Sequence, residues 1–178
     1  GAGGGIWSGG TGTFTPNNTT PNATYVPSAA ERAAGTVTLT LTSTGNGLCN
    51  AVSDQVVINI APAPAVNAGL DATVCSNNAA VQLAATVSNS GGGIWSGGTG
   101  GFSPSITAQN AVYTPSSTEL NNGSVTLNLT STGNGSCAQV TDQVFIVFTQ
   151  APVVNAGSDV TVCANGASVN LNASVTIA

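Results

Sequence analysis

The chain has 178 residues, of which only 4% are charged: six Asp or Glu and one Arg, with no Lys or His, for a formal net charge of −5. Because nucleic-acid binding needs Lys and Arg to displace counterions from phosphates, this composition argues against a nucleic-acid partner. Apolar residues make up 41% of the chain, too many for a disordered segment, but they form no run long enough to span a membrane as a helix. The chain begins at Gly1 without a recognisable signal peptide, and we expect a mature chain or an interior piece of a longer one.

Short segments of alternating apolar and polar residues follow one another along the whole sequence. A period of two is typical of strands that bury one face. No convincing helical stripe occurs, and residues 27–35 form at most one helical turn. In chain order, the expected strands occupy residues 5–9, 35–45, 54–60, 71–75, 81–88, 93–97, 111–115, 125–130, 142–148 and 169–176.

An internal repeat with an offset of 88 residues dominates the sequence. The stretch GGGIWSGGTG occurs at residues 3–12 and again, unchanged, at residues 91–100. A comparison of residues 3–90 with residues 91–178 finds 52 identical positions and needs no gap. A period of this length exceeds that of solenoid repeats and corresponds to one small domain per repeat. The sequence therefore predicts a tandem array of nearly identical domains.

The boundaries of the repeats are expected at two segments that contain proline, which interrupts helices and strand pairing. These segments are APAPAVNAG at residues 61–69 and QAPVVNAG at residues 150–157. Residues 64–151 then form one complete immunoglobulin-like repeat, residues 1–63 form the C-terminal two-thirds of a repeat, and residues 152–178 form the N-terminal strands of the next repeat.

Two explanations remain open for the observation that the first and last residues of this sequence fall within repeats and not at their boundaries. The chain is either a window on a much longer repetitive polypeptide, or a subunit whose final strands complete the open sandwich at the start of the next subunit by strand addition. In both cases residues 1–63 lack their first two strands and cannot close a core alone. A neighbouring copy must therefore supply those strands.

The number and spacing of the strands favour an all-β fold, a tandem array of immunoglobulin-like or PKD-like β-sandwiches of 88 residues. Six or seven short strands per repeat, separated by Gly, Asn and Pro turns, are typical of such sandwiches. A sandwich accommodates one large aromatic side chain near its centre, so we assign Trp7 and Trp95 to the core. The alternative is that these two side chains lie on the surface and stack on sugars.

One expected strand carries apolar residues on both faces. If Val144, Ile146 and Phe148 face the core, then Phe145 and Val147 face outward. We expect this strand at the edge of its sheet, where apolar outward residues and the absence of Lys indicate contact with another chain. A loop that folds back over these residues is the other explanation.

Each repeat carries two cysteines whose spacing is not that of a zinc site. Regularly repeated cysteine pairs in a chain without His predict disulfides formed outside the cell. Within the complete repeat the expected pair is Cys75 with Cys137, which leaves Cys49 and Cys163 for partners in neighbouring copies. If a sandwich places the two positions at opposite ends, the bonds would link adjacent repeats instead.

The carboxylates recur at the same offset, as Glu31 and Glu119, Asp54 and Asp142, and Asp71 and Asp159. Since the first and last strands of such a sandwich run in the same direction, we expect Asp71 and Asp142 near the end that faces the preceding repeat. With Asn67 and backbone carbonyls, that junction would offer oxygen ligands to calcium, for which Asp71, Asp142 and Asp159 are the candidates. The other role open to these residues is to cap turn amides. No cofactor is required.

We do not expect an enzyme. A nucleophilic Ser would lack a general base in a chain without His and Lys, and the Gly-rich runs lack the Lys of a phosphate-binding loop. A pair of carboxylates would suit glycoside cleavage, but the acids are few and lie at turns. No catalytic residue is therefore predicted.

The run from NAGLDATVC at residues 67–75 to TDQVFI at residues 141–146 resembles the repeats of very large cell-surface proteins of Bacteroidota, including adhesins associated with gliding motility. The elements that carry the resemblance are AGxDxTVC, WSGGTG, YxPS and LTSTGNG, and the likeness covers essentially the whole chain. Those repeats are similar to PKD and immunoglobulin-like domains. The resemblance implies secretion to the cell surface, a long tandem architecture and a structural or adhesive role.

We therefore expect a structural repeat unit of an extracellular filament, in which sandwiches join end to end and neighbouring copies complete one another. Its partners would be copies of the same chain. The alternative is the stalk or binding module of a cell-surface adhesin that contacts polysaccharide or another surface. Its contacts would be made by loops around Trp7 and Trp95 or around Tyr25 and Tyr113.

Overall fold

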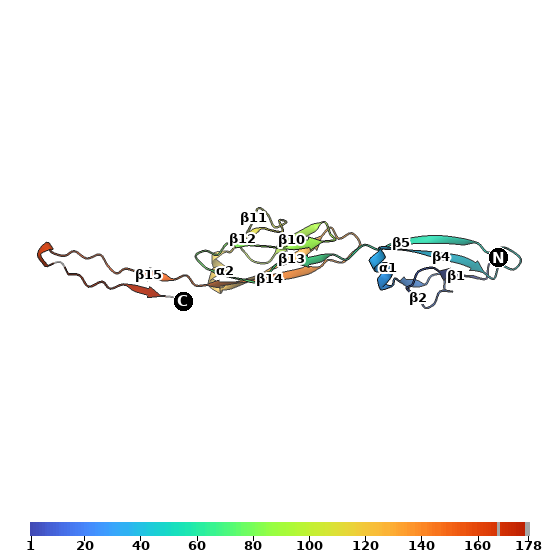
Figure 1. Ribbon diagram of the computed structural model, residues 1–178, viewed down its shortest axis with the longest axis horizontal. Helices are drawn as coiled ribbons and strands as arrows, with labels where there is room; N and C mark the ends of the chain where they lie inside the picture. The colour runs from blue at the N-terminus through green and yellow to red at the C-terminus, as the bar shows by residue number, and fades with distance from the viewer. Residues whose placement is uncertain (167, 177–178) are drawn as a thin grey trace. The chain divides into compact units, whose positions relative to one another are not determined.

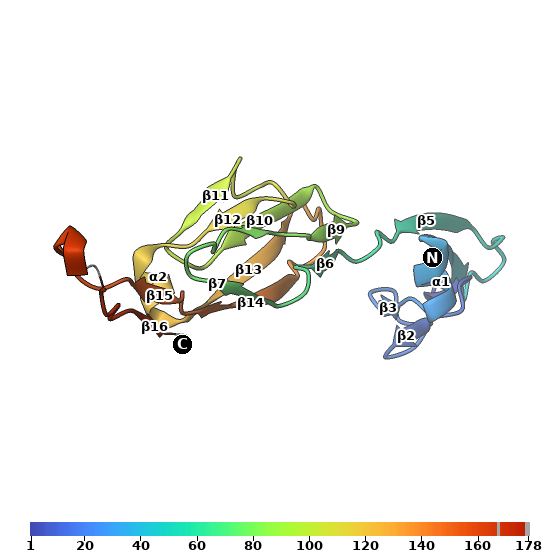
Figure 2. The ribbon, with the colours of Figure 1, turned by 60° about the vertical axis from the view of Figure 1, so that its left-hand side comes forward.

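The computed structural model describes residues 1–166 and 168–176 and divides into two compact units, Gly1–Ala63 and Pro64–Ala178. The regular secondary structure of both units is almost entirely β-strand, with one short α-helix in each (Figure 1, Figure 2). The prediction of an all-β fold is therefore confirmed. Among the described residues, neither helix approaches the length and apolar character that crossing a membrane would take.

Residues 64–151 form a sandwich of two sheets with an immunoglobulin-like arrangement. The larger sheet has the order β10 (Gly92–Ser96), β13 (Ser124–Thr132), β14 (Thr141–Thr149) and β7 (Ala72–Cys75), in which β7 runs parallel to β14. The facing sheet has the order β11 (Gly101–Ser103), β12 (Val112–Thr114) and β8 (Val81–Gln82). A further pair, β6 (Ala65–Asn67) with β9 (Thr86–Ser88), lies beside the larger sheet, where β6 contacts β13 and β14.

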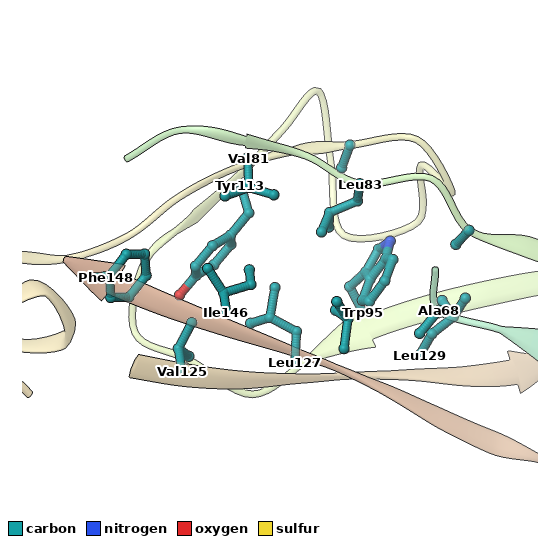
Figure 3. Packing of buried hydrophobic residues seen from close by; sticks show 13 residues of the cluster. Ala68, Val81, Leu83, Trp95, Tyr113, Val125, Leu127, Leu129, Ile146 and Phe148 are labelled. Atoms are coloured by element: carbon teal, nitrogen blue, oxygen red, sulfur yellow. The ribbon is translucent and has the colours of Figure 1, made fainter. Parts of the chain in front are cut away.

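The core of this sandwich follows from the two-residue period of its strands. On β13 the buried apolar side chains are Val125, Leu127 and Leu129, while the residues between them are more exposed. Trp95 of β10 and Tyr113 of β12 meet these side chains in the middle of the sandwich (Figure 3). The apolar residues at every second position of the strands thus form one buried layer between the two sheets.

Each unit has one helix of six residues, α1 (Ala29–Ala34) and α2 (Ser117–Asn122). Both begin with a capping box: the hydroxyl of Ser28 or Ser116 accepts the N–H of the Glu three residues on, and that Glu accepts the N–H of the Ser. The sequence indicated a helical turn only in the first repeat. The second helix, with the polar sequence STELNN, depends on its cap more than on its propensity.

Residues 1–63 contain only five strands. One sheet has the order β1 (Gly4–Ser8), β4 (Thr36–Thr44) and β5 (Ser53–Asn59), and a second consists of β2 (Thr13–Thr15) and β3 (Thr24–Val26). This unit corresponds to residues 89–151 of the complete repeat, so it has no counterpart of β6, β7, β8 or β9. It therefore lacks four short strands and not the two that the sequence predicted, because each of the two expected segments is accompanied by a short strand of the β6–β9 pair. As a result, β5 is an edge strand within this unit.

Residues 152–176 match residues 64–88, the first strands of the complete repeat. They form one pair, β15 (Val153–Asn155) with β16 (Ser174–Thr176), and a short 3-10 turn, η1 (Ala164–Gly166). In the complete repeat, β7 and β8 pair with β14 and β12. Among the described residues of this structure, the matching tail residues pair with no such strand, and they do not form strands themselves.

The expectation that residues 142–148 form an edge strand is wrong for the complete repeat, because β14 lies between β13 and β7. Phe145 is 42% exposed on the outer face, whereas Val147 is half-buried. Contact of these two residues with another chain stays a prediction. The edge position belongs to β5 of the other unit, where the counterpart of Phe145 is Val57, 58% exposed.

Candidate functional site

The candidate site is the part of the sandwich that residues 64–90 fill in the complete repeat. We call these residues the closing segment. Their buried apolar side chains are Ala68, Val81, Leu83 and Ala85. Figure 3 shows Val81 and Leu83 on the side of the core opposite to the larger sheet. The closing segment therefore covers a core face that the remaining strands of a repeat leave open.

Two carboxylates fix the closing segment to β14. Asp142 accepts a hydrogen bond through Oδ2 from the N–H of Ala68 at 2.8 Å, and Asp71 accepts one through Oδ1 from the N–H of Phe145 at 2.8 Å. In the first bond the carboxylate belongs to β14 and the N–H to the closing segment. In the second bond the carboxylate belongs to the closing segment and the N–H to β14. The bonds to Ala68 and to Gln143 hold the pKa of Asp142 below its usual value.

Backbone hydrogen bonds attach the rest of the closing segment to both sheets. The N–H of Leu83 donates to the carbonyl of Ala111 at 2.9 Å, and the N–H of Ser76 donates to the carbonyl of Thr149 at 2.8 Å. These bonds continue the pairing of β8 with β12 and of β7 with β14. The segment is thus held by hydrogen bonds at several points between Ala68 and Leu83, and not only by apolar contact.

Without a closing segment, part of the equivalent core of residues 1–63 is exposed, although Val37 and Leu39 remain buried. Val56 is 42% exposed, whereas its counterpart Val144 is 2% exposed. Trp7 is half-buried, whereas its counterpart Trp95 is 2% exposed. Closely similar sequences therefore form a covered core in one unit and a partly open core in the other.

A groove with a volume of about 330 Å³ lies on this open face, and we call it the open groove. Gly5, Leu41 and Asp54 are among the residues that line it. In the complete repeat the counterpart of Gly5 is Gly93, where an added Cβ would lie 3.0 Å from a methyl group of Val87. The closing segment thus occupies, in the complete repeat, the place that is empty in the open groove.

The described tail residues 152–166 and 168–176, which we call the tail segment, have the same hairpin as the closing segment. In the tail segment Val154 pairs with Val175, and in the closing segment Val66 pairs with Val87, which is the same register after the 88-residue shift. The turn that follows is also the same. Gly157 has a φ of 91° and Gly69 a φ of 96°, and each donates its N–H to the side chain of the Asn two residues before it at 2.8 Å.

The apolar side chains of the tail segment are nevertheless exposed. The large ones are Val153 (63%), Val154 (72%), Val160 (62%), Val162 (43%), Val169 (41%), Leu171 (85%) and Val175 (65%). The tail segment therefore has the conformation of a closing segment over part of its length but covers no core.

A second cluster, which the sequence analysis did not assign, surrounds a buried carboxylate in each repeat. Glu119, 5% exposed, accepts hydrogen bonds from the hydroxyl of Tyr113 at 2.6 Å and from the N–H groups of Thr99 and Ser116, each at 2.7 Å. The equivalent residues of the other unit are Glu31, Tyr25, Thr11 and Ser28. The signal that would have found the cluster is the spacing YxPSxxE, which places an aromatic hydroxyl and a capping box next to each other.

Hydrogen bonding keeps these carboxylates ionised. Burial alone raises the pKa of Glu119, but the hydrogen bonds from Tyr113, Ser116 and Thr99 outweigh it and lower that pKa below its usual value. The same balance lowers the pKa of Glu31 to about 2. Burial, together with the bond to Glu119, raises the pKa of Tyr113. At neutral pH the cluster is therefore a fixed anion with protonated donors around it, which suits a structural role.

The cluster also explains why WSGGTG is unchanged between the repeats. Gly98 has a φ of 72°, and a Cβ at this residue would collide with the hydroxyl of Tyr113 and lie 2.7 Å from Oε1 of Glu119. Gly10 is in the same situation in the other unit, with a φ of 72°. Only glycine allows the backbone to approach the cluster this closely.

The predicted disulfide between Cys75 and Cys137 is wrong within one repeat. We call the end of the sandwich at which β14 begins the proximal end and the end at which it finishes the distal end. Cys75 pairs with Thr149 at the distal end, whereas Cys137 precedes Thr141 at the proximal end. Eight residues of strand separate these ends by roughly 26 Å, far beyond the Cα separation of a disulfide. The described part of the chain contains no disulfide bond.

The calcium candidates do not share a site in the structure. Asp71 lies level with Phe145 and Asp142 lies three residues away along the strand, a distance of about 10 Å. Both carboxylates accept backbone N–H groups, and Asp159 lies exposed in the tail segment. The described residues include no group of three or more Asp, Glu, Cys or His placed to hold a metal. Calcium binding stays a prediction, and the structure gives Asp71 and Asp142 the role of binding backbone amides.

Of the four aromatic residues considered for sugar binding, Trp95 and Tyr113 lie in the core of the complete repeat. Trp95 stacks on Phe102 with a centroid distance of 6.2 Å and donates its Nε1–H to the carbonyl of Ala108 at 3.1 Å. Tyr113 is 0% exposed. Neither ring has a face available to a sugar in the complete repeat.

Comparisons with known proteins found no matching family model and no matching curated protein. Similar solved structures include Drosophila N-cadherin EC1-4 (14% identity, TM-score 0.44) and mouse clustered PcdhgC3 EC1-3 (14% identity, TM-score 0.41). The matches cover 82% and 83% of this chain but only 41% and 56% of those chains. Human Protocadherin-24 EC1-2 matches at 10% identity and a TM-score of 0.41 over 83% of this chain and 82% of that one. At this level the likeness carries no argument about function, and the fold assignment rests on the strand order.

Proposed function

We propose that the chain is a structural unit of an extracellular filament, in which β-sandwiches join end to end and a neighbouring copy completes each open sandwich. One observation carries this proposal. The chain has, in residues 1–63, a sandwich without its closing segment and, in residues 152–176, a closing segment without its sandwich. Apolar side chains are exposed both on the open face of residues 1–63 and along the tail segment, and such exposure favours association between copies.

The composition supports a packed, repetitive assembly. With 4% charged residues and a surface of Thr, Ser, Asn and Gly, neighbouring copies repel one another weakly and need no charge pairing. The chain has one Arg and no Lys, so trypsin has a single cleavage residue, Arg32. Resistance to salt and to proteolysis suits a structural material outside the cell.

The placement of the cysteines supports bonds between neighbouring sandwiches. Cys75 lies at the distal end and Cys137 at the proximal end of one sandwich. In a row of sandwiches joined end to end, the distal end of each faces the proximal end of the next. We propose that the cysteines pair across these junctions, in the oxidising exterior that disulfides require.

Electron microscopy and mass measurement of the 178-residue chain test this function. We expect regular filaments that grow with protein concentration and persist at high salt. The mass of the native assembly under reducing, denaturing conditions then distinguishes a polymer of 17.2 kDa subunits from one much longer polypeptide. A chain that stays monomeric at every concentration, with its open groove empty, would contradict the filament.

The alternative function, an adhesin module that binds polysaccharide, has less support. Trp95 and Tyr113 are buried, and only the half-buried Trp7 and Tyr25 of the open unit would be accessible. A glycan-array signal that disappears on Trp7→Ala would favour the adhesin. We expect no signal, because the same ring belongs to the core once the sandwich is closed.

A further inference from the structure

The two units differ mainly because residues 1–63 lack a closing segment. This difference leaves the open groove of that unit uncovered. In the complete repeat, Val87 lies against Gly93, and Ala68 donates its N–H to Asp142. The counterparts Gly5 and Asp54 line the open groove of the other unit. The open groove thus has the counterparts of the residues that contact Val87 and Ala68 in the complete repeat, but no segment lies against them.

The tail segment carries the matching residues at the matching spacing. Val175 is the counterpart of Val87, Ala156 of Ala68, and Leu171 of Leu83, each 88 residues later. The pairing of β15 with β16 already has the register of the closing segment. Because this hairpin is preformed, docking would order little more than the strands on either side of η1.

We propose that residues 152–176 of one chain close the sandwich of residues 1–63 of a second copy, each tail residue taking the place of the residue 88 positions earlier in the complete repeat. This proposal rests on the proposed function and names the contact that forms the filament. Val175 and Ala156 enter the open groove, and Leu171 covers the exposed core. The tail adds a strand parallel to β5, which is otherwise an edge.

Two carboxylates set the register of this contact. By equivalence with the bonds of Asp142 and Asp71, Asp54 of the acceptor accepts the N–H of the donor's Ala156. In the same way, Asp159 of the donor accepts the N–H of the acceptor's Val57. In the undocked unit, Asp54 accepts the N–H of its own neighbour Gln55 at 2.9 Å. A slip of two residues keeps the apolar face inward but breaks both new bonds, so the pair selects one register.

The path of the chain through the complete repeat favours a second copy as the occupant. The chain enters this sandwich beside the proximal end, where Ala68 meets Asp142, and leaves it at the distal end, where Thr149 meets Cys75. The tail segment therefore starts at the opposite end of the sandwich from the link to residues 1–63, roughly 26 Å away along β14.

Two variants of the full chain separate donor from acceptor. Leu171→Asp places a charge on the donor at a side chain that is 85% exposed and belongs to no core of its own chain. Gly5→Val fills the open groove of the acceptor, where the added atoms meet the flexible end of Leu41. Leu70→Asp is the matched control, because Leu70 is 93% exposed and the next repeat has Ser158 at this position.

Light scattering should give monomers of 17.2 kDa for Leu171→Asp and for Gly5→Val alone. An equimolar mixture should give a one-to-one complex, because the Gly5→Val chain still donates and the Leu171→Asp chain still accepts. Hydrogen exchange should then slow in β5 of the Leu171→Asp chain. The Leu70→Asp control should assemble as the wild type does. Val175→Asp serves as a second donor variant if Leu171→Asp does not fold by circular dichroism.

A mixture that remains monomeric would overturn the docking. If the wild type and Leu171→Asp both form filaments, the filament stands and this contact is wrong. If the wild type is monomeric, the filament itself fails. Slow exchange of β5 in that monomer would place the tail in its own chain, and fast exchange would show an empty groove; either result overturns a second copy as the occupant.

The carboxylates allow a quantitative check in the same complex. In the Leu171→Asp acceptor, the additional change Asp54→Ala should raise the Kd of the one-to-one complex by about 10- to 100-fold, as expected for one hydrogen bond to a charged group. Asp142→Ala, the same change at the equivalent position of the complete repeat, should lower the Tm of its own sandwich and leave this Kd unchanged. Equal effects of the two substitutions on the Kd would contradict the assigned register.

Discussion

At the scale of single residues, the buried glutamate of each repeat connects three separate parts of the sandwich. Glu119 joins the WSGGTG turn, the strand that carries Tyr113 and the cap of α2 through one carboxylate. Because all its donors are protein groups, losing any of them leaves a buried charge incompletely satisfied. The exact repetition of these residues in both units follows from that dependence.

We expect the free energy of unfolding to fall as the pH is lowered from about 5 to about 2. The pKa of Glu119 is lowered in the folded chain, and that of Glu31 is lowered to about 2. A carboxylate of this kind stabilises the fold above its unfolded pKa, and this contribution is lost as the pH falls through the folded pKa. Denaturant unfolding of the monomeric Leu171→Asp variant across this range measures it. Glu119→Gln should be less stable at neutral pH and should show a shallower pH dependence, whereas a flat profile in the parent would contradict the assignment.

Gly98→Ala should destabilise the complete repeat by about 2 kcal/mol or more, from the left-handed backbone and the collision with the Tyr113 hydroxyl. Gly101→Ala is the matched control. Gly101 lies in β11, its added Cβ meets nothing within 4 Å, and its φ is not in the left-handed region, so a change within about 0.5 kcal/mol is expected. Thermal unfolding of both variants compares them, and equal losses would remove the steric explanation.

At the scale of elements, pairing partners decide which segments become strands. Residues 72–75 and 160–163 have nearly the same sequence, but only the first form a strand, β7, because only they lie beside β14. The same holds for residues 81–82 and 169–170, of which only the first pair with β12. Strand propensity alone does not fold the tail segment.

Hydrogen exchange in the monomeric Gly5→Val variant should show this difference. We expect the amides of residues 72–75 and 81–83 to exchange on the order of 100-fold more slowly than those of residues 160–163 and 169–171. Addition of the Leu171→Asp acceptor should slow the tail amides and leave those of the closing segment unchanged. Protection of the tail before the acceptor is added would contradict a partner-dependent strand.

At the scale of the whole molecule, the pairing of the cysteines depends on the order in which sandwiches follow one another along the filament. If the tail closes the next copy, Cys163 takes the distal position of that sandwich and faces the next copy's Cys137, while Cys75 faces the next copy's Cys49. Oxidised glutathione suffices as the oxidant: each pair of thiols gives two electrons and two protons to it, and two molecules of reduced glutathione are released.

Peptide mapping of oxidised filaments should therefore find Cys75 linked to Cys49 and Cys163 linked to Cys137. Non-reducing electrophoresis should show a ladder of covalent multimers that collapses to 17.2 kDa on reduction. Cys75→Ser with Cys163→Ser should abolish the ladder without preventing assembly, because the apolar contact and the backbone pairing remain. A Cys75–Cys137 link within one chain would contradict both the junction and the geometry of the sandwich.

Much of this molecule could be predicted from its sequence, because the signals concerned are local. The two-residue alternation at Val125, Leu127 and Leu129 depends only on the strand period, and it predicted both the fold class and which face is buried. The 88-residue repeat is visible without coordinates. It predicted that one part of the chain lacks the strands that another part carries.

Tertiary structure alone decided which distant residues meet. The position of β14 between β13 and β7, and with it the separation of Cys75 from Cys137, depends on the order of strands in the sheet, which alternation does not encode. The partners of Glu119 come from three segments that only the folded sandwich brings together. The two-residue period predicts which face of a strand is buried. A hydrogen bond, however, needs two particular groups within about 3 Å of each other, and only the packed sandwich determines that distance.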